Sequence, residues 1–144
     1  MTYLLDVNVL VALVDSAHVG HDAAHDWFAR EGRRDWSTCP TTENGLVRVI
    51  ANPKYPNALP TAADAIALLV QLVSLPGYVF WSDDITLRDA NRFNATRMLT
   101  VGQVADTYLL ALAASRGGKL ATLDRRLSPV AVQKGAQSLH LIGG

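Results

Sequence analysis

Four acidic residues stand next to expected strand ends or in expected first helical turns: Asp6, Glu43, Asp106 and Asp124. Asp6 is the most informative, because it lies between two apolar runs and should be buried. A buried carboxylate is costly unless it has a partner or a metal ion. Carboxylates that cluster also raise one another's pKa, and a hard divalent cation removes that penalty. Ligand sets made only of oxygen favour Mg²⁺ or Mn²⁺ over zinc. The predicted chemistry is therefore metal-assisted attack of water on a phosphate.

Alternating strands and helices are expected to bring these acids to one edge of a sheet. Short apolar runs predict strands at 2–5, 35–39, 78–81, 119–122 and 138–142. Apolar periodicity and capping residues predict helices at 8–14, 18–30, 41–51, 61–74, 84–94 and 103–116. This order indicates an α/β fold with a parallel sheet covered by helices on both faces. Ligands of such sheets bind beyond the carboxyl ends of the strands, and each of the four acids is assigned to that edge.

Each acid also has a purely structural interpretation. Glu43 and Asp106 could serve only as partners of a helix dipole, since acids are common in first helical turns. Asp124 precedes Arg125 and Arg126 and could be a turn residue in a surface ion pair. The coincidence of four acids at one edge favours a shared site.

Length and composition restrict the class of protein. The 144 residues predict one domain, 1–144, and the 13 basic and 13 acidic residues give no net charge, which argues against a strongly basic nucleic-acid binder. If the four acids held a metal, the periphery would keep 13 basic and 9 acidic residues, a charge of +4. A single cysteine, Cys39, excludes a disulfide framework. Because no apolar run approaches the ~20 residues of a membrane span and the start lacks a signal-peptide pattern, we expect a cytoplasmic protein.

Four segments of the chain resemble PIN-domain ribonucleases, in particular the VapC-type toxins of bacterial toxin–antitoxin pairs. They are LLDVNVLVAL, TTENGLVRVI, VADTYLLALAASRGGKLATLD and the trailing RRL. The resemblance implies a five-stranded sheet of order 3-2-1-4-5 and Mg²⁺- or Mn²⁺-dependent endoribonuclease activity that leaves a 5′-phosphate and a 3′-hydroxyl. It also implies a homodimer and a cognate antitoxin that inserts a segment into the active groove.

The resemblance assigns roles residue by residue. The metal-binding acids would be Asp6, Glu43, Asp106 and Asp124, with Asn8 and Thr122 in support. The chain departs from many relatives at Leu127, where they carry Phe, and we expect this to affect packing and not chemistry. Three arginines precede Asp106 on one side of the expected helix and loop, and they could bind an RNA backbone: Arg88, Arg92 and Arg97. A solvated face with local ion pairs is the alternative for them.

Three other functions fit parts of the pattern. A catalytically silent PIN module would bind RNA or an antitoxin without cutting, although the complete set of acids argues against it. A phosphoacceptor receiver domain would need an Asp ending the third strand and a Lys ending the fifth. Here the third strand ends near Trp81, and Lys119 opens a strand instead. A DNA flap nuclease would need long insertions, for which the chain has no room.

Overall fold

The computed structural model describes residues 1–98 and 100–143 and confirms the expected α/β fold. All pairings in its five-stranded sheet are parallel, and the strand order is β3-β2-β1-β4-β5. None of the described helices is long and apolar enough to cross a bilayer. The strands are β1 (Tyr3–Leu5), β2 (Trp36–Thr38), β3 (Tyr78–Phe80), β4 (Lys119–Thr122) and β5 (Leu139–Leu141), and the α-helices are α1 (Val7–Val14), α2 (His21–Arg30), α3 (Pro40–Ile50), α4 (Ala62–Val73) and α5 (Gln103–Ser115). Short 3₁₀ helices lie at Gly32–Arg34, Ala95–Arg97 and Ala136–Ser138.

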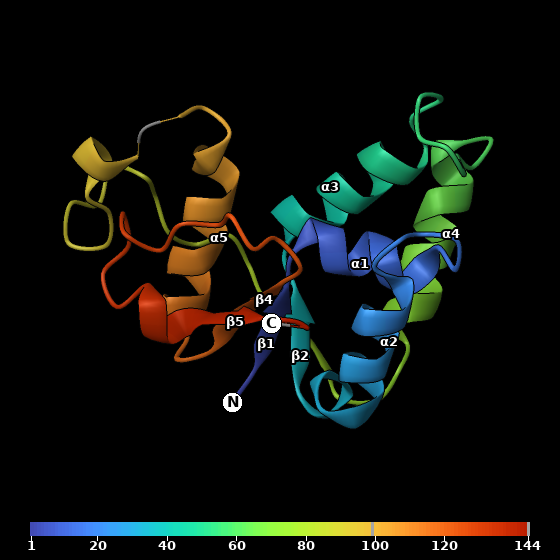
Figure 1. Cartoon of the computed structure of the whole chain (residues 1–144), viewed down its shortest axis with the longest axis horizontal. Helices are drawn as coiled ribbons and strands as arrows, with labels where there is room; N and C mark the ends of the chain where they lie inside the picture. Colours follow the sequence, from blue (N-terminus) through green and yellow to red (C-terminus); the bar gives the residue numbers. More distant parts are fainter. Residues whose placement is uncertain (99, 144) are drawn as a thin grey trace.

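The helices form two layers on opposite faces of the sheet. Helices α1 to α4 lie on one side and α5 on the other (Figure 1). Successive residues of a strand point to opposite faces, so neighbours in β1 serve different cores. Leu5 packs in the cluster formed with α1 to α4, whereas Leu4 packs with Leu109 and Leu110 of α5. The sheet is therefore buried on both faces, and β1 lies at its centre.

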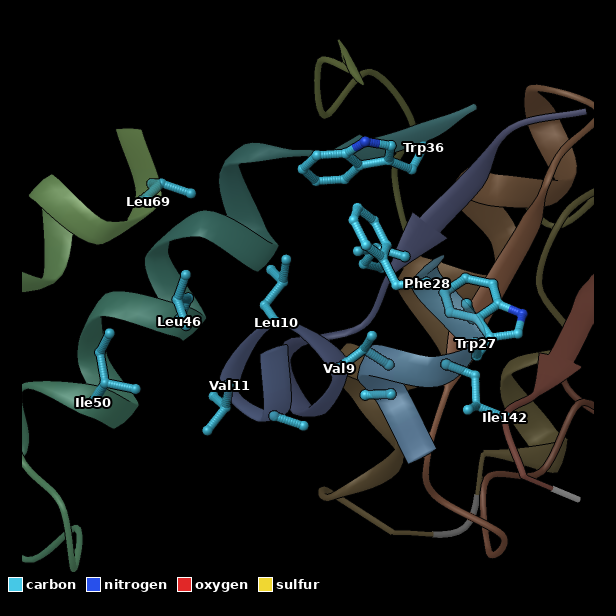
Figure 2. Packing of buried hydrophobic residues seen from close by; sticks show 14 of the residues in the cluster. Val9, Leu10, Val11, Trp27, Phe28, Trp36, Leu46, Ile50, Leu69 and Ile142 are labelled. Atoms are coloured by element: carbon cyan, nitrogen blue, oxygen red, sulfur yellow. The ribbon is translucent and has the colours of Figure 1, made fainter. Parts of the chain in front are cut away.

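The larger core is built around aromatic and aliphatic side chains between α1, α2 and α3 (Figure 2). Trp36 is fully buried, and the ring of Phe28 meets it edge-on at a centroid distance of 5.2 Å. Leu10 of α1 and Leu46 of α3 are also fully buried in this cluster. Truncating such a leucine typically costs 2–5 kcal/mol, on the order of the net stability of many domains. This packing fixes α1 and α3 against the sheet edge where the acids were expected.

The prediction of a helix at 84–94 is wrong. The segment forms turns instead, because its short polar side chains bond to nearby backbone groups. The backbone N–H of Asn91 donates to the carboxylate of Asp89 at 2.9 Å, and that of Arg88 donates to the hydroxyl of Thr86 at 3.3 Å. Phe93 then pairs with Val132 in an isolated antiparallel bridge. These contacts satisfy the backbone without a helical ladder.

The starts of α1 to α4 also differ from the predicted ones by one to three residues, whereas α5 begins at Gln103 as predicted. Helix α2 begins at His21 and not at 18, because the His18 ring accepts a hydrogen bond from the N–H of Gly20 in the preceding turn. Helix α3 begins at Pro40, with Cys39 as the capping residue. The hydroxyl of Thr42 accepts from the Cys39 N–H at 3.0 Å, so it supplies the reciprocal contact of the cap.

Candidate functional site

Asp6 lies where β1 ends and α1 begins. It caps the helix, and its carboxylate accepts a hydrogen bond from the backbone N–H of Val7 at 2.8 Å. The residue is only 4% exposed. Helix α3 comes close to this end of α1 because Gly45 has no side chain: a Cβ there would lie 2.5 Å from a methyl group of Val7. The local sequence thus buries a carboxylate at the carboxyl edge of the sheet and brings α3 beside it.

The hydroxyl of Thr122, at the end of β4, connects Asp6 with Asp124. It donates to the Asp6 carboxylate at 2.8 Å and accepts from the backbone N–H of Asp124 at 3.1 Å. It also accepts from the side-chain amide of Asn8 at 3.1 Å, and the Asn8 oxygen accepts from the N–H of Leu123. A hydroxyl has one donor and two acceptor positions, so all three are used here. The structure therefore places Asn8 and Thr122 against Asp6.

Asp106 belongs to the same electrostatic group as Asp6 and Asp124. It stands in the first turn of α5, as predicted. Burial, together with the charges of Asp6 and Asp124, raises the pKa of its carboxyl from 3.8 to about 6. Burial also raises the pKa of Asp6, against the hydrogen bonds from Thr122 and Val7 that lower it, and the Asp124 charge adds to the rise. The structure thus brings three of the four predicted acids, Asp6, Asp106 and Asp124, close enough to repel one another.

Little positive charge offsets this repulsion. Arg126 lies 3.7 Å from the Asp124 carboxylate but is 95% exposed, so solvent screens the pair. Within residues 1–98 and 100–143, neither Asp6 nor Asp106 forms an ion pair. An excess of hard oxygen donors without a compensating cation matches the chemistry that Mg²⁺ and Mn²⁺ prefer.

Glu43 is oriented differently from the other three acids. It lies in the first turn of α3, but its carboxylate accepts from the hydroxyl of Thr38 at 2.6 Å and from that of Tyr78 at 3.4 Å. No interaction in the described part of the chain joins it to the other carboxylates. In that part, no group of three or more histidine, cysteine or acidic side chains is already arranged to hold a metal ion. The donor types fit a divalent cation, whereas a common coordination sphere is not assembled.

Asp83 is a contact residue that the sequence analysis did not single out. It bonds to two helices, α3 and α5. One carboxylate oxygen accepts from the N–H and hydroxyl of Thr41 at 3.1 and 2.8 Å, and the other accepts from the hydroxyl of Tyr108 at 3.0 Å. Asp83 therefore links the start of α3, which carries Glu43, to α5, which carries Asp106. No sequence signal points to this link, because the partners are 42 and 25 residues away.

The three predicted RNA-contacting arginines do gather, although the helix expected to present them is absent. Arg88, Arg92 and Arg97 line one hollow of about 740 Å³, together with residues of the segment 130–133. Arg92 is also ion-paired with Asp89 at 3.2 Å. Arg88 and Arg97 are exposed, and neither pairs with a carboxylate of the described residues.

The family model of the PIN domain matches residues 3–133. Ribonuclease VapC44 of Mycobacterium tuberculosis is 40% identical over 141 residues, which are 98% of each chain. Ribonuclease VapC39 of the same organism is 42% identical over 128 residues, which are 89% of this chain and 92% of the relative.

Two solved structures show the same fold at low sequence identity. One is Mycobacterium tuberculosis VapC20, described as a toxin that cleaves the sarcin-ricin loop. It matches with a TM-score of 0.61 at 12% sequence identity, and the match covers 92% of this chain and 97% of the VapC20 chain. The other is VapBC2 from Rickettsia felis bound to a DNA fragment from their promoter, with a TM-score of 0.60 at 14% identity and 99% of both chains covered. The fold of this chain is thus found in proteins of different sequence.

Proposed function

This chain belongs to the PIN-domain family, as a VapC ribonuclease, and from that premise we propose that it is a metal-dependent endoribonuclease acting as the toxin of a toxin–antitoxin pair. The arrangement that supports the metal dependence is the grouping of Asp6, Asp106 and Asp124, in which burial and the charges of the other two acids raise the pKa of Asp106 to about 6. A bound cation would relieve the repulsion among the three carboxylates and favour their ionised forms. Hard oxygen donors make Mg²⁺, or Mn²⁺, the fitting ion.

We propose that the ion is held by the acidic quartet Asp6, Glu43, Asp106 and Asp124. When bound, it would supply Lewis-acid chemistry, lowering the pKa of a water molecule and neutralising charge on the scissile phosphate. Thr122 and the Val7 N–H hold the Asp6 carboxylate in one orientation. The Glu43 carboxylate, fixed by Thr38 and Tyr78, would join the site directly or through water.

The reaction needs no nucleophilic side chain. The oxygen of water attacks phosphorus in line with the 3′ oxygen of the preceding nucleotide, which leaves and takes up a proton. The products would be a 5′-phosphate and a 3′-hydroxyl.

The proposed partners follow from the family. We propose RNA as substrate, a cognate antitoxin protein that inserts a segment into the active groove, and a homodimer in the cytoplasm. The antitoxin is supported by the likeness to VapBC2, a toxin and antitoxin assembly. A second copy of the chain is supported by the edge strand β3, where the apolar side chains Val79 and Phe80 are exposed. An exposed apolar edge strand favours association with another chain.

The function is tested with purified protein and single-stranded RNA in the presence of Mg²⁺ or Mn²⁺. We expect cleavage that EDTA stops and that both Asp6→Asn and Asp106→Asn abolish. Asp22→Asn is the matched control, since Asp22 is an exposed acid in the first turn of α2. Mapping of 5′ ends then identifies the cut sites. Cleavage in EDTA, or full activity of both variants, would overturn the proposal, and RNA binding without cleavage would identify a catalytically silent module.

A further inference from the structure

We infer that the hollow lined by Arg88, Arg92 and Arg97 is a binding subsite for the sugar-phosphate backbone of single-stranded RNA, separate from the acidic residues. This inference rests on the proposed function, because it assigns a second point of contact to the same substrate. The hollow has a volume of about 740 Å³. Among the residues that the structure describes, its lining includes three guanidinium groups and no acidic side chain.

Two chain segments build the hollow, and backbone contacts join them. The Asn94 N–H donates to the carbonyl of Ala131 at 2.8 Å, and the Gln133 N–H donates to that of Arg92 at 3.0 Å. Between these bonds, Phe93 and Val132 form an antiparallel bridge. These bonds hold the backbone at Arg92, and Arg88 and Arg97 lie within five residues of it along the chain, so the site is partly preorganised and less ordering is needed when an anion binds.

The lining groups suit phosphate oxygens. Arginine presents a planar fork of donors that matches phosphate bidentately, and it keeps its charge at all physiological pH values. Side-chain amides of Asn91, Asn94 and Gln133 also line the hollow. The Asn94 side-chain oxygen already accepts from Thr96 at 2.6 Å, which leaves its amide group as a donor. Donors of these types dominate protein contacts to phosphate and sugar.

The hollow is adapted to the RNA backbone and not to bases. Stacking on exposed aromatic rings is the usual means of holding unpaired bases. Phe93 is the only aromatic residue among the described residues of the lining, and it is 4% exposed. Binding here should therefore depend little on sequence and strongly on salt.

Packing connects this subsite to the helix of the candidate active site. Phe93 and Val132 belong to the same buried cluster as Leu109 and Leu110 of α5. Helix α5 also carries Asp106 in its first turn. A strand of RNA held in the hollow would thus lie on segments that pack against the helix presenting one of the acids.

The test measures binding apart from cleavage. A fluorescently labelled single-stranded RNA 20-mer of random sequence is titrated in EDTA over a range of salt concentrations. The variant is R88Q/R97Q, in which both exposed arginines become neutral. The matched control, R33Q/R34Q, removes two exposed charges from the 3₁₀ helix Gly32–Arg34, which precedes the amino end of β2. Thermal melting verifies that both variants are folded.

We expect R88Q/R97Q to weaken RNA binding by about tenfold or more, since each lost contact is a hydrogen bond to a charged group. The dependence of log K on log salt should become shallower by about 1.4, at roughly 0.7 for each lost phosphate contact on single strands. The control should change neither quantity by as much.

The possible outcomes separate the subsite from the proposed activity. If R88Q/R97Q binds RNA like the unmodified protein, the subsite is refuted, even where Asp106-dependent cleavage is intact. If binding falls as expected but no RNA is ever cut, the subsite stands and the endoribonuclease proposal fails. If RNA binding is unchanged while binding of the cognate antitoxin weakens, the hollow is a protein-binding surface, and the inference is overturned.

Discussion

Replacing Asp106 with Asn is expected to stabilise the metal-free protein although it abolishes cleavage. Burial, and then the charges of Asp6 and Asp124, raise the pKa of Asp106 from 3.8 to about 6. Between these pH values the folded protein holds a proton that the unfolded chain has lost. The free energy of unfolding therefore falls as the pH rises through this window, and the loss is complete above about pH 6. Asparagine has nearly the same shape and no charge, so it removes this penalty at neutral pH.

The size of the effect follows from the pKa. A rise from 3.8 to about 6 is about 2 pH units, and at about 1.4 kcal/mol per unit it corresponds to about 3 kcal/mol. Asp106 is only partly buried, so solvent screening reduces the figure to about 1 kcal/mol. For a protein of this length, that change moves the melting temperature by roughly 3 °C. At pH 4 the gain should be nearly absent, because most of the penalty accrues above that pH.

The assay is urea or thermal unfolding in EDTA at pH 4 and pH 7.5. Asp64→Asn is the matched control, because Asp64 is an exposed acid in the first turn of α4 and loses only its helix-terminal contacts. Added Mg²⁺ should stabilise the unmodified protein and have less effect on Asp106→Asn, since binding to the folded state adds stability by mass action. If Asp106→Asn lowers the stability at pH 7.5 as much as Asp64→Asn, the carboxylates do not repel one another and the argument for a metal loses its basis.

Three further changes test the contacts around the site. Thr122→Val should lower the free energy of unfolding, measured by urea denaturation, by about 2 kcal/mol, because the buried Asp6 carboxylate loses a hydrogen bond. An unchanged free energy of unfolding would show that this hydroxyl does not stabilise the Asp6 carboxylate. Asp83→Asn keeps only one of the two acceptor oxygens that link α3 to α5. We expect the two helices to be misplaced and kcat for RNA cleavage to fall roughly tenfold or more. An unchanged kcat would show that the link does not position the site. Burial raises the pKa of Cys39 to about 11, so iodoacetamide at pH 8 should modify this thiol only in urea; rapid modification of the native protein would contradict its burial.

The sheet and most helices could be predicted from the sequence because a buried parallel strand appears as a short apolar run. The strand predicted at 119–122 is found as β4, Lys119–Thr122. Asp6 and Asp106 were placed well for the same reason, since strand ends and helix starts determine where such residues lie. The coarse position of each acid is thus a local property of the chain.

The parts that could not be predicted depend on contacts between distant residues or on competing local bonds. The orientation of Glu43 depends on Tyr78, which is 35 residues away in the sequence. The segment 84–94 has residues compatible with a helix, but Thr86 and Asp89 bond to the backbone and form turns. Its arginines nevertheless lie together, because the pairing of Phe93 with Val132 replaces the helix as their support.

Helix α5 can hold Asp106 near two other carboxylates because its own packing outweighs their repulsion. Burial of the Asp106 charge and its repulsion by the other acids together amount to about 1 kcal/mol after allowance for solvent. Leu109 and Leu110 of the same helix are almost fully buried, and truncation of either would cost roughly 2–5 kcal/mol. Tyr108 adds a hydrogen bond to Asp83, which is also bonded to α3. The packing of α5 therefore holds Asp106 near the other two carboxylates without a cation, and only the last approach of the acids into a common coordination sphere would be left to metal binding.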